Sequence, residues 1–175
     1  MSHTPMTDYL KQILLNQYEA ALCMLHETLA ACPASAWDDK IAIRTLGQTA
    51  YHTLFFTDYY LSPSEEAFRY RPLHAIGGDE LADGLNPPGL PQPEAIDYLR
   101  LIRELARENI AAESEQSLQA PAAFARRTFS RGELHIYNIR HVQHHTAQLQ
   151  AHLRRTIPAM QSDDFLQWRG SGWRE

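Results

Sequence analysis

The stretch from Ser130 to Thr156 constrains the fold most, because it carries the signals for both ends of one long helix. It opens with Ser-Arg-Gly-Glu, a capping box in which the Ser130 hydroxyl accepts from the Glu133 amide and the Glu133 carboxylate reaches back. The two arginines of its last turn suit the helix dipole, and Pro158 ends the helix. Five of the nine histidines of the chain lie within it.

Three further stretches place apolar residues at three- and four-residue steps, which predicts amphipathic helices over about 5–32, 46–61 and 93–117. The connection 62–92 is rich in proline and glycine and is long enough to let two successive helices run parallel. No strand is predicted. The sequence therefore predicts an all-α four-helix bundle with a long crossover between helices two and three, formed as a single domain by residues 1–175.

Two peripheral segments carry tryptophan. We expect Trp37, in the connection 34–43, to fold over one end of the bundle. The tail 158–175 contains Phe165, Trp168 and Trp173, and we expect it to pack on the bundle as well. Burial of these aromatic side chains against an apolar surface is more favourable than their exposure to water.

Two histidines of the last helix form the first candidate metal-binding pair. His141 and His145 are four residues apart, so their rings lie on one helical face and could hold one divalent cation. A histidine on a helix is more often a residue at the edge of the core, and such a pair needs a third ligand. His144 offers a competing pair with His141, three residues away.

The third candidate ligand is His52, in the second predicted helix. It lies within an aromatic run, where an imidazole without a partner would be costly to bury. Asp58 of the same helix is expected to be exposed. His74 and Asp79 of the long connection are expected to be ordinary polar loop residues rather than ligands.

These residues resemble the DinB-like, or YfiT-like, superfamily of metal-dependent hydrolases. The resemblance rests on Ala-Tyr-His-Thr-Leu-Phe at 50–55 and on His-x-x-His-His-x-x-Gln-Leu at 141–149, and it follows the helix order of nearly the whole chain. It implies an up-down-down-up bundle and metal ligation by His52, His141 and His145, with His144 as a neighbour. Members of the family carry nickel, zinc or other divalent ions.

The resemblance implies a metal-dependent hydrolase or thiol transferase that acts on a small-molecule substrate or a thiol cofactor. Three neutral imidazoles leave a divalent ion with positions open for water or substrate. No general base is evident, because the HExxH pattern of metalloproteases is absent: Val142 and Gln143 lie between the two histidines. The alternatives are a non-catalytic, stress-related bundle with a structural ion, and haem ligation by histidines from two helices. A pocket over the ion, lined by the crossover, would favour catalysis.

Charge and composition limit the partners. A net charge of −5 and a pI near 6.0 argue against a nucleic-acid partner, which needs a surplus of Lys and Arg. No apolar run is long enough for a membrane span, and the N-terminus does not resemble a signal peptide. Cys23 and Cys32 are too far apart along one helix to form a disulfide, which favours reduced cysteines and a cytoplasmic protein. The apolar helices one and two predict a homodimer.

Overall fold

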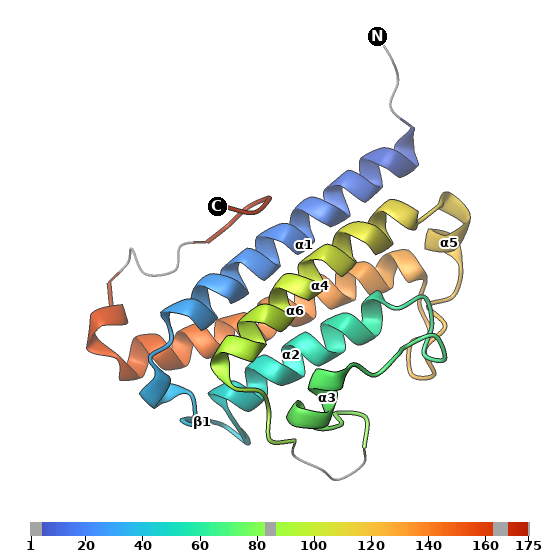
Figure 1. Cartoon of the computed structure of the whole chain (residues 1–175). Helices are drawn as coiled ribbons and strands as arrows, with labels where there is room; N and C mark the ends of the chain where they lie inside the picture. Colours follow the sequence, from blue (N-terminus) through green and yellow to red (C-terminus); the bar gives the residue numbers. More distant parts are fainter. Residues whose placement is uncertain (1–4, 83–86, 163–167, 175) are drawn as a thin grey trace.

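The computed structural model describes residues 5–82, 87–162 and 168–174 and is an all-α bundle, as predicted (Figure 1). Four long helices form it: α1 (Met6–Ala31), α2 (Leu46–Leu61), α4 (Gln92–Ala112) and α6 (Arg131–Thr156). No helix among the described residues is both long and apolar enough to cross a bilayer.

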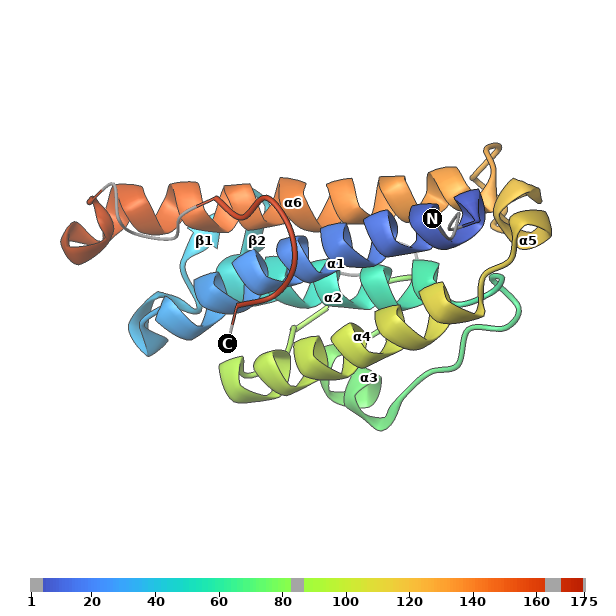
Figure 2. The same cartoon turned by 90° about the horizontal axis from the view of Figure 1, so that it is seen from above.

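The long helices pack in a ring, with α1 and α2 each lying between α4 and α6. Tyr18 is hydrogen-bonded to His135, and Thr28, later on α1, accepts a hydrogen bond from Gln150, later on α6. Helices α1 and α6 therefore run parallel. Side-chain contacts between α2 and α6, and between α1 and α4, run in opposite sequence order, so each of these pairs is antiparallel. The helix directions are therefore up-down-down-up, which Figure 2 shows from above.

Local capping signals fix where two of the long helices begin. Thr45 and Gln48 form a capping box at the start of α2, and Ser130 and Glu133 form one at the start of α6, as their sequences predict. Each box satisfies two backbone amides that the helix itself leaves without partners. Helices α2 and α6 thus start at positions that the sequence specifies.

The connections contain short elements. Between α1 and α2 lie a 3₁₀ turn, Ala34–Ala36, and a small antiparallel ladder of β1 (Lys40–Ile41) and β2 (Arg44–Thr45), which the sequence did not predict. Helix α3 (Pro72–Gly77) lies in the crossover, α5 (Glu115–Gln119) precedes α6, and a 3₁₀ turn, Pro158–Met160, follows it. Trp37 is nearly buried and its Nε1 donates to Leu90 O at 3.0 Å, which joins the first connection to the end of the crossover.

Helix α2 is buried on nearly all sides, and its aromatic residues fill the centre of the bundle. Asp58, expected to be exposed, is instead buried, because it lies on the side of α2 that faces Tyr98 of α4 and Arg71 of the crossover. Arg71 Nε and Nη2 donate to its carboxylate at 2.6 and 3.0 Å, and Tyr98 Oη donates at 2.9 Å. His74 is buried against Tyr98 as well, so the prediction of an ordinary loop histidine was also wrong.

Residues 170–173 of the C-terminal tail lie against α1 and α4. The Trp173 ring is 4.0 Å from the Arg103 guanidinium, and Gly172 N donates to Asn16 O at 3.0 Å. Trp168, in contrast, is 77% exposed. Phe165 lies outside the described residues.

Candidate metal site

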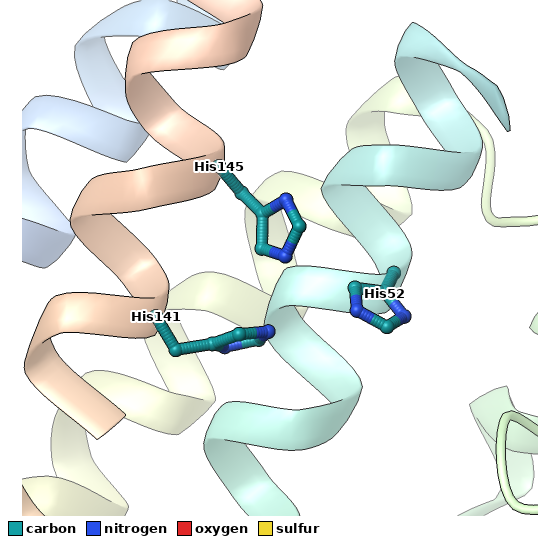
Figure 3. Close-up of side chains that lie close together, drawn as sticks. All are labelled: His52, His141 and His145. Atoms are coloured by element: carbon teal, nitrogen blue, oxygen red, sulfur yellow. The ribbon is translucent and has the colours of Figure 1, made fainter. Parts of the chain in front are cut away.

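Three histidines converge between α2 and α6 (Figure 3). His141 and His145 stand one turn apart on α6, and the antiparallel neighbour α2 places His52 opposite them. Their ring centroids are 4.6 to 5.5 Å apart. One nitrogen from each ring can be chosen such that all three lie within 4.8 Å of one another, close enough for the cluster to hold a metal ion.

An aromatic side chain packs beside this cluster. The Phe56 ring, one turn after His52 on α2, lies 4.8 Å from the His52 ring and 6.1 Å from the His141 ring. All three histidines are partly buried. The cluster is thus shielded on the Phe56 side and still reachable from solvent.

Two outer partners set the tautomers of the rings. His52 Nδ1 lies 3.0 Å from Glu80 Oε2, and His145 Nδ1 lies 2.8 Å from Gln148 Oε1. Both oxygens accept hydrogen bonds, so each Nδ1 carries a proton and each Nε2 is left with a lone pair for a cation. Such second partners are what ligating histidines usually have.

His141 has no such partner. Its Nδ1 is buried and, within the described part of the chain, makes no hydrogen bond. A buried ring nitrogen without a partner is costly, and a bound cation is one way to satisfy the ring. The donor set, two oriented imidazoles and one with an unsatisfied nitrogen, therefore fits a divalent ion.

Electrostatics keep two of the rings neutral. Burial, reinforced by the neighbouring imidazoles, lowers the pKa of His141 to about 3. Burial also lowers the pKa of His145 to about 4, although the hydrogen bond that its Nδ1 donates to Gln148 Oε1 opposes this shift. Both rings are therefore neutral near pH 7, the form in which an imidazole binds a metal.

His144 lies outside the group of three. Its Nε2 is 3.2 Å from Gln148 Nε2, so it contacts the outer partner of His145 rather than the space between the helices. The competing pair, His141 with His144, is thus not the one that faces α2. The structure brings together the three histidines that the sequence singled out.

A pocket of about 480 Å³ adjoins the cluster. It shares Phe56 and Glu80 with the surroundings of the histidines, and its walls come from α2, from the crossover at 80–82 and from the segment 124–127. On the other side, His141 and His144 line a second hollow together with Tyr137 and Arg140. Of the three clustered histidines, His141 lines the second hollow, whereas the first pocket reaches the cluster only through the neighbouring Phe56 and Glu80.

Sequence reasoning missed Glu80 as a partner of the site. The Glu80 carboxylate is nearly enclosed, and Arg44 Nη2 donates at 3.3 Å to the same oxygen, Oε2, that His52 contacts. Glu80 lies in an irregular connection, where no periodicity predicts which side chain points inward. The only indication of Glu80 in the sequence is general: a ligating histidine needs a hydrogen-bond acceptor, and the crossover is the nearest connection that contains carboxylates.

An all-α bundle with a three-histidine cluster between two antiparallel helices defines a class of helical proteins with a candidate metal site. A model of the DinB superfamily matches residues 17–149, which is most of the chain and includes all three histidines. The chain belongs to the DinB superfamily. Comparison with curated proteins and with solved structures gave no match.

Proposed function

We propose that His52, His141 and His145 bind one divalent ion, zinc or nickel, and that the protein is a metal-dependent hydrolase or thiol transferase. Such an ion would supply Lewis acidity, which lowers the pKa of a bound water or thiol toward neutrality. The proposal is supported by membership of the DinB superfamily and by the neutral, convergent imidazoles.

The residues around the cluster have separate tasks in this proposal. Glu80 and Gln148 hold the Nδ1 protons of His52 and His145, so that both rings keep one orientation. The rings of Phe56 and Tyr60 form an apolar wall that removes water from one side of the substrate. The substrate is a small molecule or a thiol, bound in the pocket that shares Phe56 and Glu80 with the cluster.

This pocket is the observation that carries the catalytic proposal. A structural ion needs no empty space beside it, whereas a catalytic ion must be reached by substrate. The pocket is lined partly by the crossover, at Glu80, Leu81 and Ala82, and contains both aromatic and charged groups. It is of the size in which small ligands bind, about 300–1,000 Å³.

One observation favours the second candidate, a non-catalytic metal-binding protein. The carboxylate closest to the cluster in the described residues, that of Glu80, is already engaged by His52 and Arg44. A general base should be free to take a proton from the reacting group. Under this alternative the ion stabilises the bundle, and no reaction takes place in the pocket.

The test is elemental analysis of protein purified without added metal, followed by screens for thiol transfer and ester hydrolysis. We expect about one zinc or nickel per chain in the wild type and a sharp loss in the single variants His52→Ala, His141→Ala and His145→Ala. His144→Ala is the matched control and should retain the ion. Loss of metal in His144→Ala with retention in His145→Ala would show that the wrong face of α6 was chosen. Metal without activity in either screen would favour the non-catalytic candidate.

We also propose a cytoplasmic homodimer that packs through α1. Helix α2 offers no free face, but α1 exposes Met6, Tyr9, Leu10 and Ile13 at helical spacing, 37 to 72% accessible. An apolar stripe of this kind is a typical interaction surface. Cys23 and Cys32 are free and buried, in keeping with a reducing compartment. Light scattering at roughly tens of micromolar should give a dimer for the wild type and a monomer for Ile13→Glu. A monomeric wild type would refute the interface.

A further inference from the structure

Arg127 is held at the wall of the pocket by a tight turn that precedes α6. Its backbone amide donates to Phe124 O at 2.8 Å, and its guanidinium lies 4.7 Å from the Tyr137 ring centroid and 5.2 Å from that of Tyr60. Its Nη2 donates to the hydroxyls of both tyrosines. The side chain is therefore fixed in place by neutral groups.

Arg127 is unusual in lacking a carboxylate partner. The other well-enclosed arginines are paired: Arg131 with Glu113, Arg71 with Asp58, and Arg103 with Glu19. Within the described residues no carboxylate lies within ion-pair distance of Arg127, and its Nε has no hydrogen-bond partner. Its Nη1 donates to the Arg126 carbonyl at 3.1 Å, another neutral group. A guanidinium can pair with a carboxylate through its planar fork of N–H groups, and the charge of this one is balanced by no carboxylate of the described residues, which leaves it available to an anion.

The position of Arg127 relates it to the three histidines. Tyr137 stands one turn before His141 on α6, and Tyr60 packs on Phe56, which touches His52 and His141. Arg127 and Phe56 line the same pocket. A ligand held at Arg127 could therefore extend past Phe56 toward the cluster.

Three other charged residues line the pocket. Glu80 is engaged by His52 and Arg44, Glu65 Oε2 accepts from Ala125 N at 2.8 Å, and Arg126 is exposed. Four of the seven uncharged lining residues are aromatic: Phe56, Tyr59, Tyr60 and Phe124. The pocket thus combines aromatic rings with a cation, Arg127, that has no carboxylate partner among the described residues.

We infer that Arg127 binds the carboxylate of the substrate, and that the substrate class is a small organic acid whose carboxylate and reacting end lie at opposite ends of the molecule. This inference rests on the proposed function, since the reacting end lies at the proposed metal site. It adds the substrate class and names Arg127 as the residue that positions the molecule.

The test uses Co²⁺-loaded protein, because a thiolate bound to Co²⁺ gives a charge-transfer band in the near ultraviolet. The probes are 3-mercaptopropionate, 4-mercaptobutyrate and 6-mercaptohexanoate, each compared with the mercaptoalkanol of equal length. We expect the acid to bind at least about tenfold more tightly than the alcohol at one or more lengths, as a charge-assisted hydrogen bond predicts. No preference for the acid at any length would overturn the inference.

Two variants locate the effect. Arg127→Gln should reduce the preference for the acid to within about twofold, with Co²⁺ affinity and alcohol binding unchanged. Arg126→Gln, the neighbouring arginine that also lines the pocket, is the matched control and should keep the preference. A preference that survives Arg127→Gln, or disappears in Arg126→Gln, would overturn the assignment to Arg127.

The design separates this inference from the proposed function. If wild-type protein does not bind Co²⁺ through the three histidines, the proposed function fails; if it binds Co²⁺ without preferring acids, only the inference fails. Should Arg127→Gln not fold, Arg127→Lys decides, because lysine keeps the charge but lacks the two-pronged fork. A several-fold weaker preference for the acid supports the inference, and an unchanged one contradicts it.

Discussion

At the scale of single residues, the candidate site depends on groups that do not themselves face the space between the rings. The Glu80 carboxylate orients His52, and Arg44 in turn holds Glu80. If Glu80 were absent, the His52 ring could rotate and its proton could move to the nitrogen needed for the ion. The affinity of the candidate site for a metal ion is therefore expected to depend partly on the crossover.

We expect Glu80→Gln to lower metal affinity by about 10- to 100-fold, because the amide is a weaker acceptor and can present its NH₂ to the ring instead. The measurement is a competition titration against a chromophoric chelator. Asp79→Asn is the control, since Asp79 accepts from Tyr70 Oη and Leu81 N on the surface and does not contact the cluster. Equal affinities in wild type and Glu80→Gln would show that His52 does not need this partner.

The three histidines could be predicted from helix periodicity, from the burial expected for His52 and from the resemblance to the DinB-like family, which favoured His145 over His144. His141 and His145 follow from their spacing, and His52 follows from an aromatic helix that had to be buried. Glu80 and Arg127 could not be predicted in this way. Both lie in irregular connections, whose paths depend on tertiary contacts rather than on a repeating pattern.

At the scale of elements, one buried ionic group ties the crossover to the bundle. Asp58 on α2 receives two hydrogen bonds from Arg71, next to α3, and one from Tyr98 on α4. His74 of α3 adds a contact with Tyr98 at 2.9 Å. The crossover that supplies Glu80 is thus anchored at a second place, away from the histidines.

Asp58→Asn should lower the free energy of unfolding by about 2–3 kcal/mol, because hydrogen bonds to a charged group are lost and Arg71 keeps a half-enclosed charge. Urea denaturation followed by circular dichroism measures this. Asp97→Asn removes an exposed ion pair with Arg100 and should change nothing measurable. If Asp58→Asn were as stable as Asp97→Asn, the buried ionic group would contribute no more to stability than an exposed ion pair.

A second buried group joins α4, α5 and α6. Arg131 donates to the last carbonyls of α2 and to Glu113, and His135 lies 3.0 Å from the same carboxylate. Burial raises the pKa of Glu113, but hydrogen bonds from His135, Ser117 and Arg131 outweigh it and lower the pKa to about 2. Burial lowers the pKa of His135.

This group makes stability depend on pH with a definite sign. Between pH 4.5 and 2 the unfolded chain takes up a proton at Glu113 that the folded chain does not, so stability is complete above pH 4.5 and is lost as the pH falls toward 2. The lowered pKa of His135 acts in the same direction. As the pH falls below about 6.5, the unfolded chain takes up a proton at this histidine that the folded chain does not, so stability decreases further. Melting temperatures at several pH values should fall on acidification, and Glu113→Gln should be less stable at pH 7 with a shallower slope below pH 4.5. An equal slope would contradict this account.

At the scale of the whole molecule, apolar side chains from all four long helices form one continuous cluster of buried residues. We therefore expect the bundle to fold without the proposed ion, unlike a zinc finger, where metal binding supplies most of the folding energy. This core, and the bundle built on it, follow from the apolar periodicity of the sequence, whereas the β1–β2 ladder is too short to leave a pattern.

Chelation should therefore lower the melting temperature and leave the helical circular dichroism intact at room temperature. An ion held at one hundred times its dissociation constant adds about 2.7 kcal/mol to stability, and this amount is lost when the ion is removed. Thermal scans with and without EDTA, followed at 222 nm, make the comparison. Loss of the helical signal on adding EDTA would show that the ion is required for folding.

The separation of the three histidines along the chain has a consequence for the life of the protein in a cell. His52 and His145 come from opposite halves of the sequence and meet only when α2 and α6 have docked, so an ion that they share binds the finished fold and not a nascent or opened chain. Chains without an ion open more often and are degraded faster by proteases. We expect the abundance of this protein to rise and fall with the supply of its metal, without any change in the transcription of its gene.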